Sequence, residues 1–515
     1  WRVAPGGGLA GRWASTKPLP RHVLNVIDGR CSGAADGRVL ENINPATGGA
    51  IGTIARSNAS DVEAAVAAAE RASVEWRGTA LSHRAQLLHR VGDLIQERIA
   101  EFIAAESEDS GKPLKLAGSV DIPRAIANLR FFADAAPFLP TAHHPSDSGF
   151  GGEAMNITAR SPLGVVGLIT PWNLPLYLLS WKVAPAIVMG NAVVAKPSEL
   201  TPSTASMMAE VFMEAGAPSG LVNVVQGLGG EVGEPLVNHP SVKAISFTGG
   251  TSTGRLVGRS AADQFKKTSL ELGGKNATLV FDDCGDVKSV AKAVARASFL
   301  NSGQICLCGS RIFIQDGIAE EFTQALVDEV KSLNVGDPRD SSSDLGPVVS
   351  AAHRDKVESY LRLAAVEGGK VLCGGKRPSS VELAGGFYLE PTLVQGLPWS
   401  GRVATEEIFG PIATLHTFQT EEEAIEKANC VEYGLSSSVW TTSIERAHRV
   451  ATGIQVGMVW VNTWLHRDLR TPFGGVKASG LGREGGWYSL EFFSETKNIC
   501  YGMGLAPPPM PGSMK

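Results

Sequence analysis

A cysteine and a glutamate, each in a glycine-rich frame, are the residues of this chain best suited to covalent chemistry. Glu271 lies in Leu-Glu-Leu-Gly-Gly-Lys at 270–275, and Cys306 ends Gly-Gln-Ile-Cys at 303–306, 35 positions further on. A thiolate attacks a carbonyl carbon, and a carboxylate removes a proton from water. Together the two side chains could capture an aldehyde covalently and later hydrolyse the thioester.

Each residue also has a purely structural interpretation. A lone cysteine is most often an inert packing residue, which is the role we expect for Cys308, and a lone glutamate is most often a solvated surface charge. Cys306 and Cys308 could form a metal pair, but no second Cys or His cluster accompanies them, so we expect no metal. The seven cysteines are scattered, which excludes a disulfide framework and favours a reducing compartment.

Composition narrows the classes of function. The chain has 515 residues, of which 43% are hydrophobic and 19% charged, and its formal net charge is -5. This length allows two or three domains, and the charge gives no reason to expect nucleic acid or an anionic membrane as a partner. No run of 18 apolar residues occurs, so we expect no membrane span.

The two ends of the chain differ from the rest. Residues 1–27 contain four basic residues and no acid, and 505–515 are rich in Pro and Gly. We therefore predict a leader at 1–22, which is either the remnant of a transit peptide or a disordered segment without an address, and a tail at 502–515. The compartment is accordingly the mitochondrial matrix or the cytoplasm.

The middle of the chain alternates between short apolar runs and helical patterns. The runs predict buried strands at 164–170, 191–195, 221–225, 242–247 and 277–281, and the patterns predict helices at 203–215, 231–238 and 252–262. This order indicates a parallel, doubly wound α/β sheet, which binds ligands at the carboxyl ends of its strands. Turns at those ends carry Thr170 to Asn173, Lys196 to Glu199, and Gly249 with Gly250.

Helices and a second α/β pattern flank this sheet. Ser60 and Glu63 predict a capping box that opens a helix towards Trp76. A second helix starts near Ser82 and is stopped by Gly111-Lys112-Pro113. After Cys306 we predict strands at 311–315, 435–440 and 458–461, and helices at 318–333, 354–367 and 443–452.

Seven motifs make the chain resemble the NAD(P)-dependent aldehyde dehydrogenase superfamily from about residue 23 to 500. They are Pro171-Trp172-Asn173, Lys196-Pro197-Ser198-Glu199, Phe247-Thr248-Gly249, the two frames that contain Glu271 and Cys306, Glu406-Glu407-Ile408-Phe409-Gly410-Pro411, and Pro472-Phe473-Gly474-Gly475. Within the superfamily the chain is most similar to the 2-aminomuconic semialdehyde dehydrogenases. Asp121-Ile122-Pro123-Arg124 and Trp464-Leu465-His466-Arg467 carry this closer likeness.

The resemblance implies a fold and an assembly. We expect a Rossmann-like NAD-binding domain at 23–140 and 163–273, an α/β catalytic domain at 274–486, and oligomerisation segments at 141–162 and 487–501 that form a small β arm. The alternation of Asn156 to Arg160 suits an edge strand. The resemblance implies a homodimer or a homotetramer.

The resemblance also assigns roles. Cys306 is the expected nucleophile, Glu271 the base that activates water, and Asn173 a donor to the oxyanion. NAD would be held by Thr170, Trp172, Lys196, Glu199, Gly249, Gly250, Glu407 and Phe409. Glu199 would repel a 2′-phosphate and so favour NAD over NADP. Many relatives have Ser in place of Gly250, and Thr251 or Ser252 could supply the missing hydroxyl.

The last expectation concerns the substrate. In the similar subfamily, Arg124 and Arg467 anchor a substrate carboxylate, although either residue could instead serve in an internal salt bridge or at the surface. The expected reaction is the NAD-dependent oxidation of 2-aminomuconate 6-semialdehyde, a step of tryptophan catabolism. The alternatives are the 2-hydroxymuconic semialdehyde, a general or betaine aldehyde, or a non-enzymatic relative. Cys306, Glu271, Asn173 and Glu407 speak against the last of these.

Overall fold

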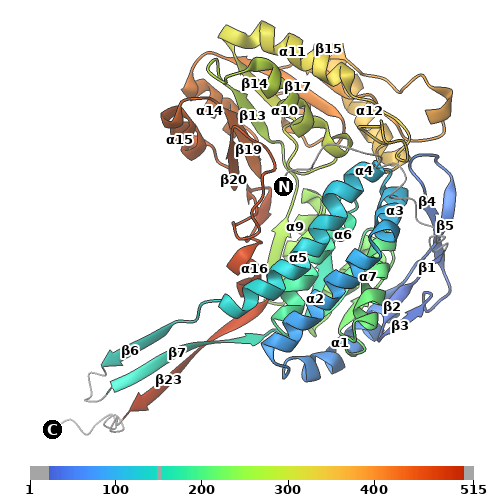
Figure 1. Ribbon diagram of the computed structural model, residues 1–515, viewed down its shortest axis with the longest axis vertical. Helices are drawn as coiled ribbons and strands as arrows, with labels where there is room; N and C mark the ends of the chain where they lie inside the picture. Colours follow the sequence, from blue (N-terminus) through green and yellow to red (C-terminus); the bar gives the residue numbers. More distant parts are fainter. Residues whose placement is uncertain (1–21, 148–152, 504–515) are drawn as a thin grey trace.

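The computed structural model describes residues 22–147 and 153–503, so most of the predicted leader and tail lies outside the described residues. The chain forms two lobes and a projecting arm (Figure 1). None of the described helices is long and apolar enough to cross a membrane.

The first lobe is built on an eight-stranded sheet. Its order is β22 (Gly480–Leu481), β12 (Lys267–Glu271), β11 (Val242–Thr248), β8 (Val165–Ile169), β9 (Ala192–Lys196), β10 (Val222–Val224), β2 (Asn25–Ile27) and β3 (Arg30–Ser32). The strands from β12 to β10 are parallel. The chain runs from β8 to β10 in one direction and then places β11 on the other side of β8, so the order reverses at β8. This reversal confirms the predicted doubly wound sheet.

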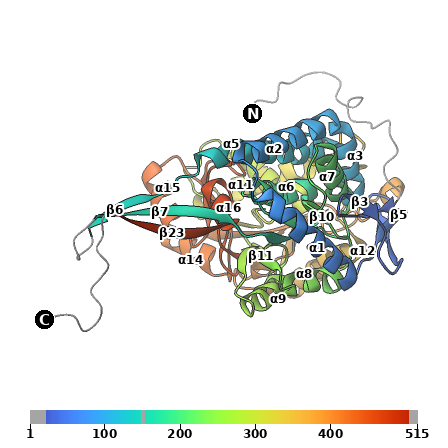
Figure 2. The ribbon, with the colours of Figure 1, turned by 90° about the horizontal axis from the view of Figure 1, so that it is seen from below.

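Helices cover both faces of this sheet, as Figures 1 and 2 show. One layer contains α2 (Leu81–Glu97), α3 (Ile99–Ser110), α5 (Ile122–Ala135), α6 (Pro175–Val188) and α7 (Ser203–Glu214). The other contains α1 (Ala59–Trp76), α8 (Glu234–Asn238) and α9 (Thr251–Ala262). The central strands β8, β9 and β10 are almost fully buried, which explains why their sequences read as continuous apolar runs.

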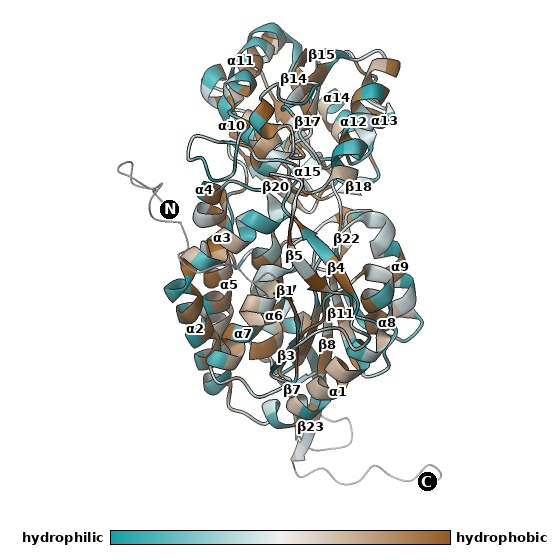
Figure 3. Ribbon diagram, turned by 90° about the vertical axis from the view of Figure 1, so that its right-hand side faces the viewer, coloured by the Kyte–Doolittle hydropathy of each residue, from teal (hydrophilic) through white to brown (hydrophobic). Residues whose placement is uncertain are grey.

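The second lobe has its own sheet and apolar cores. The strand order is β15 (Lys370–Cys373), β16 (Thr392–Gln395), β17 (Ile412–Phe418), β14 (Arg311–Gln315), β13 (Ala277–Val280), β19 (Ser436–Trp440) and β20 (Met458–Val461). Its helices are α10 (Val287–Phe299), α11 (Ala319–Ser332), α12 (Ala351–Val366), α13 (Arg402–Thr405), α14 (Glu421–Asn429) and α15 (Ile444–Gly453). Figure 3 shows hydrophilic and hydrophobic residues alternating along outer helices such as α11, as expected for helices with one face on the core.

Further short elements lie outside the two large sheets. They are β1 (His22–Val23), β4 (Val39–Ile43), β5 (Ala50–Ala55), α4 (Leu114–Leu116), the π-helical turn η2 (Ala117–Asp121), β18 (Tyr433–Gly434), β21 (Val476–Lys477) and α16 (Gly486–Phe492).

The arm is a three-stranded antiparallel sheet that extends away from both lobes (Figure 2). It contains β6 (His143–Asp147), β7 (Glu153–Pro162) and β23 (Ser494–Met503). β7 pairs with β23 along its whole length but with β6 only over residues 153–157. The expectation of an edge strand at Asn156 to Arg160 is therefore wrong for Asn156 and Ile157, whereas residues 158–160 have no partner in β6.

Three local predictions also differ from the structure. The capping box of α1 consists of Asn58 and Asp61 rather than Ser60 and Glu63, so the helix starts one residue before Ser60. The long helix after Ser82 is interrupted at Arg98. The run at 277–281 belongs to the second sheet, and the last parallel strand of the first sheet is β12. Because β12 begins with the polar residues Lys267 and Thr268, it did not read as an apolar run in the sequence.

Candidate active site

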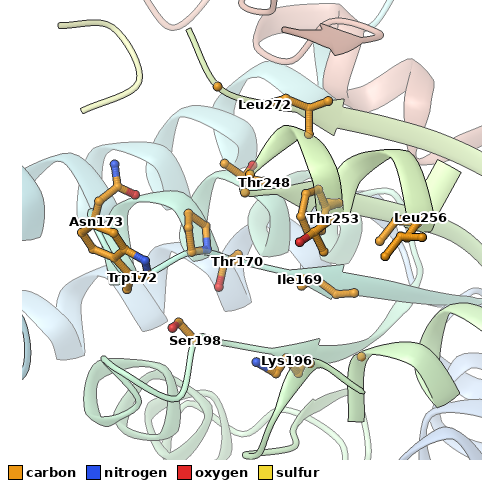
Figure 4. A pocket seen from close by; sticks show the side chains of 18 of the residues that line it. Ile169, Thr170, Trp172, Asn173, Lys196, Ser198, Thr248, Thr253, Leu256 and Leu272 are labelled. Atoms are coloured by element: carbon orange, nitrogen blue, oxygen red, sulfur yellow. The ribbon is translucent and has the colours of Figure 1, made fainter. Parts of the chain in front are cut away.

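A cavity of about 850 Å³ lies at the carboxyl ends of β8, β9, β11 and β12 and is closed by residues of the second lobe. Figure 4 shows Thr170, Trp172, Asn173 and Lys196 along it. The structure brings ten of the predicted site residues together here. They are Thr170, Trp172, Asn173, Lys196, Glu199, Gly249, Gly250, Cys306, Glu407 and Phe409.

A second cavity, of about 40 Å³, lies on the other side of the cysteine. Aromatic and aliphatic side chains form most of its wall, and the charged residues in the wall are Asp121 and Arg467. Cys306 lines both cavities. A thiol at this junction can face a cofactor on one side and a small substrate on the other.

The loop before the cysteine has an unusual backbone. Asn301 and Ser302 have φ angles of 55° and 56°, and Gly303 has a φ of 72°. Left-handed backbone costs about 1–3 kcal/mol for a residue with a side chain, and it persists only where the surroundings enforce it. A Cβ at Gly303 would overlap the carbonyl oxygen of Gly410, which explains why the motif has glycine there.

Hydrogen bonds from several segments hold this loop. The Ser302 hydroxyl donates to the carbonyl of Gly346 at 2.7 Å, and the Gln304 side chain accepts from the Val349 N–H at 3.0 Å. The carbonyl of Gln304 accepts from Asn173 Nδ2 at 2.9 Å, and that of Cys306 accepts from Asn276 Nδ2 at 2.7 Å. The sulfur is therefore carried on a rigid support that contacts both lobes.

The Cys306 side chain is half-buried and electrostatically unfavourable for an anion. Burial raises the pKa of its thiol well above the usual value, the carboxylates of Glu407 and Glu271 raise it further, and Arg467 acts in the opposite direction. In the protein alone the side chain is therefore a thiol at neutral pH, so its activation requires a base or an additional positive charge.

Glu271 ends β12 and is buried, but it lines neither cavity. Neither of its carboxylate oxygens has a hydrogen-bond partner among the described residues. Burial and the nearby Glu484 raise its pKa well above the usual value. Its charge contributes to the raised pKa of Cys306, so the two side chains lie within electrostatic reach. The next two residues, Leu272 and Gly273, do line the larger cavity.

Sequence reasoning missed a buried ion pair beside Glu271. Lys182 Nζ donates to Glu484 Oε1 at 2.5 Å and to the Ser246 hydroxyl at 2.8 Å. Lys182 lowers the pKa of Glu271, and Glu484 raises it, so the pair influences the protonation of the predicted base. A lysine in the otherwise apolar helix α6 was the available signal, because a buried ammonium needs a partner.

Asn173 is fixed by hydrogen bonds to both its side chain and its backbone carbonyl. The bond from Nδ2 to Gln304 uses one of its two amide hydrogens, which leaves the other for a ligand. Its backbone carbonyl accepts from Lys112 Nζ at 2.9 Å and from Asn301 Nδ2 at 3.1 Å. Lys112 is fully buried and paired with Asp121. The sequence marked Lys112 only as part of a helix stop, although it positions Asn173.

The N-terminus of α9 faces the larger cavity at Gly250. A Cβ at Gly249 would lie 2.5 Å from the Phe247 ring, whereas one at Gly250 would meet nothing within 4 Å. Neither expected substitute hydroxyl lines this cavity, and Thr253 does so instead. Free N–H groups at a helix start bind phosphate groups, so this end of the cavity suits a pyrophosphate.

Glu407 and Phe409 close the other end of the cavity. The Glu407 carboxylate accepts from the Gly274 N–H at 2.8 Å. A Cβ at Gly273 would overlap this carboxylate, and one at Gly274 would lie 2.8 Å from the carbonyl oxygen of Cys306, which accounts for the two glycines. Phe409 has a φ of 61°, and its carbonyl lies 2.7 Å from His353 Nε2. Burial lowers the pKa of His353 to about 4, so its ring is neutral and can donate this bond.

The two predicted substrate arginines lie near the smaller cavity. The Arg467 guanidinium carbon is 4.0 Å from the Phe473 ring centroid, and that of Arg124 is 5.6 Å from the ring centroid of Tyr177, which lines the cavity. Arg124 lowers the pKa of Arg467, so their charges are close. No carboxylate lies within 4.0 Å of either guanidinium in residues 22–147 and 153–503, and Arg124 Nε and Nη2 are buried without a partner. The internal salt bridge that the sequence left open is therefore absent from the described residues.

The chain is similar to known proteins over most of its length. Residues 32–499 match the model of the aldehyde dehydrogenase family. A 2-aminomuconic 6-semialdehyde dehydrogenase of Pseudomonas sp is 46% identical, with 92% of this chain and 97% of the relative covered. A 2-hydroxymuconic semialdehyde dehydrogenase of Pseudomonas sp. (strain CF600) is also 46% identical, with 93% and 99% covered.

Among solved structures, betaine aldehyde dehydrogenase from Staphylococcus aureus in complex with NAD+ superposes with a TM-score of 0.91 at 36% identity, and 96% of each chain is covered. The family match spans both lobes and the arm, and it includes the segments that carry Glu271, Cys306 and Glu407. The chain belongs to the aldehyde dehydrogenase family.

Proposed function

We propose that this aldehyde dehydrogenase uses NAD to oxidise a semialdehyde that carries a carboxylate, of the 2-aminomuconate or 2-hydroxymuconate type. The observation that carries the proposal is a pair of guanidinium groups at the cavity that reaches Cys306, Arg467 in its wall and Arg124 over the Tyr177 ring. Among the described residues neither has a carboxylate within 4.0 Å, and Arg124 Nε and Nη2 are buried without a hydrogen-bond partner. Buried donors without an acceptor are costly, and a bound carboxylate would satisfy them.

The larger cavity fits NAD on three grounds. The open helix start at Gly250 suits the pyrophosphate, Lys196 and Glu199 at the end of β9 suit the adenosine ribose, and Glu407 suits the second ribose. Lys196 Nζ and Glu199 Oε2 lie 3.0 Å apart, so the acid is pre-oriented. When bound there, NAD+ accepts the hydride that the substrate carbon loses.

The residues of the chain divide the remaining chemistry. Cys306 gives up its thiol proton to solvent, and its Sγ then bonds to the aldehyde carbon while the π pair of the carbonyl moves to the oxygen. The free N–H of Asn173 Nδ2 stabilises the charge that develops there. After oxidation the acyl group is a thioester on Cys306. Glu271 then accepts a proton from water, hydroxide adds to the carbonyl, and the carboxylic acid leaves as the thiol is restored.

The same two arginines distinguish this proposal from a neutral or cationic substrate. A cationic aldehyde, such as that named for the Staphylococcus aureus enzyme, would be repelled by Arg467 at the cavity wall. Steady-state kinetics with anionic, neutral and cationic aldehydes of matched length test this directly. The proposal expects the highest kcat/KM for the carboxylate-bearing semialdehyde, and it fails if the cationic aldehyde is preferred.

We also propose a homodimer or a tetramer of dimers. In the described residues the edges of the arm are β6 and β23, and exposed strand edges pair readily with another chain. Tyr501 and Met503 on β23 are about half exposed, as expected for side chains that a partner would cover. Light scattering should find a multiple of 54.1 kDa at micromolar concentration, and a monomer alone would contradict the proposal. For the compartment, cytoplasm and mitochondrial matrix remain the two expectations.

A further inference from the structure

A carboxylate in the wall of the smaller cavity has no role in the steps above. Asp121 ends the π-helical turn η2, its side chain is fully buried, and it lines the same cavity as Cys306 and Arg467. One of its oxygens, Oδ2, accepts from Lys112 Nζ, whereas Oδ1 has no hydrogen-bond partner among the described residues. A buried acceptor of this kind is costly unless a ligand or a water satisfies it.

Arg124 follows Asp121 by three positions, across the junction of η2 and α5. Residues three apart on a helix lie on the same face. They form no ion pair with each other, and Asp121 Oδ1 and Arg124 Nε and Nη2 all lack partners. One helical turn therefore offers a free acceptor beside free donors, next to a cavity that ends at the nucleophile.

A ligand with two adjacent polar groups would satisfy the free atoms of both side chains. A carboxylate satisfies the guanidinium donors, and a hydrogen-bond donor on the adjacent carbon satisfies Asp121 Oδ1. A neutral or unsubstituted chain would leave Oδ1 buried and unpaired, which is the condition that makes polar sites selective. Lys112 holds the other oxygen, so the free oxygen cannot rotate away without breaking a buried ion pair.

We propose that Asp121 is a specificity-determining residue that accepts a hydrogen bond from an amino or hydroxyl group on the carbon next to the substrate carboxylate. The inference rests on the proposed function and deepens it. It specifies the substrate class as semialdehydes with a 2-amino or 2-hydroxy acid head, held by Arg467 and Arg124 at the carboxylate and by Asp121 at the neighbouring substituent.

The first test uses the native enzyme and three substrates that differ only at carbon 2. These are a 6-oxohexadienoate with a 2-hydroxy group, the same molecule with hydrogen there, and the same molecule with a methoxy group, which keeps the oxygen but cannot donate. We expect kcat/KM to be about tenfold to a hundredfold higher for the hydroxy compound. Equal values for the hydroxy and hydrogen compounds would overturn the proposal without any variant.

The second test uses Asp121→Asn. Lys112 would orient the amide oxygen towards itself, so the amide NH₂ would face the cavity and meet the substrate donor with another donor. We expect the preference for the hydroxy compound over the hydrogen compound to disappear. Asp134→Asn, an exposed position on the same helix α5, is the matched control and should retain it.

The ratio of the two substrates separates this role from a structural one. Loss of the Lys112 ion pair could disturb Asn173, but that would lower kcat/KM for both substrates by the same factor and leave their ratio unchanged, which would overturn the proposal. If the native enzyme oxidises neither anionic semialdehyde, the proposed function fails. If it oxidises both equally, only the role of Asp121 fails.

Discussion

The two cavities that meet at Cys306 are built in different ways. Six glycines line the larger one, among them Gly249 and Gly250 at the start of α9. Among the described residues no glycine lines the smaller one, whose wall carries the charged side chains of Asp121 and Arg467. Glycine lets a ligand approach the backbone closely, so such a cofactor site depends less on particular side chains, whereas a substrate site with two charged side chains can change by single substitutions. The chemistry is therefore shared with the family, and selectivity is local.

The largest expected effect on turnover comes from changing Cys306, where the two cavities meet. Cys306→Ser should reduce turnover on the order of a thousandfold or more, because a hydroxyl is a much poorer nucleophile than a thiolate. NAD binding, followed by fluorescence titration, should stay close to normal because the larger cavity is intact. Cys308→Ser is the matched control and should retain activity, since Cys308 is buried and lines neither of the two cavities. An active Cys306→Ser enzyme would refute the assignment.

Glu271→Gln separates the two chemical stages. We expect a burst of NADH with little further turnover, a steady-state loss of about 10²–10⁴, and an acyl-enzyme visible by mass spectrometry. No burst and no adduct would mean that Glu271 acts earlier or only structurally.

The same variant gives a pH test. Burial and Glu484 raise the pKa of Glu271, and only its carboxylate form accepts a proton. The steady-state rate of the native enzyme should therefore rise with pH through that raised pKa, and this dependence should vanish in Glu271→Gln. The burst rate should keep its own rise with pH, because the pKa of Cys306 is raised as well. Loss of both dependences in the variant would contradict the separation.

Changes in the substrate cavity should lower activity on anionic aldehydes only. Arg467→Ala and Arg124→Ala should each lower kcat/KM for a carboxylate-bearing semialdehyde about tenfold to a hundredfold, through KM. A neutral aldehyde of similar length should be almost unaffected. Arg470→Ala, at an exposed residue paired with Asp468, is the control. Equal losses on both substrates would make the arginines structural and favour a neutral substrate.

The cofactor cavity should distinguish NAD from NADP, with a smaller effect on kcat/KM than the arginine substitutions have. NAD should exceed NADP in kcat/KM by at least about tenfold, since a 2′-phosphate would meet the carboxylate of Glu199. Glu199→Gln should reduce that ratio, and Glu214→Gln, at an exposed position on α7, should not. Equal use of both cofactors by the native enzyme would exclude the role given to Glu199.

The smallest expected effect is an increase in the affinity for NAD. Gly250 has a φ of -69° and open space at its Cβ position, so a serine fits without strain. Gly250→Ser should lower the KM for NAD by about twofold to tenfold, the value of one added hydrogen bond. Gly249→Ser is the contrasting variant, because its Cβ would lie 2.5 Å from the Phe247 ring, and it should raise that KM. A weaker cofactor affinity in Gly250→Ser would show that the phosphate does not approach this helix start.

The sequence predicted the cofactor cavity better than the surroundings of the two catalytic candidates. Turns at strand ends are local features, so residues 170–173, 196–199 and 248–250 could be grouped before the sheet was seen. The pairing of Lys182 with Glu484 spans about three hundred positions, and no local pattern reveals it. The Glu271 carboxylate lies against Gly474, and Lys182 and Glu484 shift its pKa. These neighbours are also far away in the sequence, so no local pattern reveals them.

The same distinction holds for the fold. The alternation at Asn156 to Arg160 identified a strand, but not its neighbours, because β23 joins it from residues 494–503. In α1 the error was local, since Asn58 and Ser60 are both good N-caps and only the backbone decides between them.

The two asparagines that hold the nucleophile loop have a consequence for how the enzyme loses activity. Asn173 belongs to the first lobe, and its side chain donates to the carbonyl of Gln304. Asn276 immediately precedes β13 of the second lobe, and its side chain donates to the carbonyl of Cys306. Each lobe has its own apolar core, so slight loosening between them costs less than unfolding either one. Catalytic inactivation in mild denaturant should therefore precede the loss of helical circular dichroism, and the reactivity of Cys306 towards an alkylating agent should report how tightly the two lobes are docked.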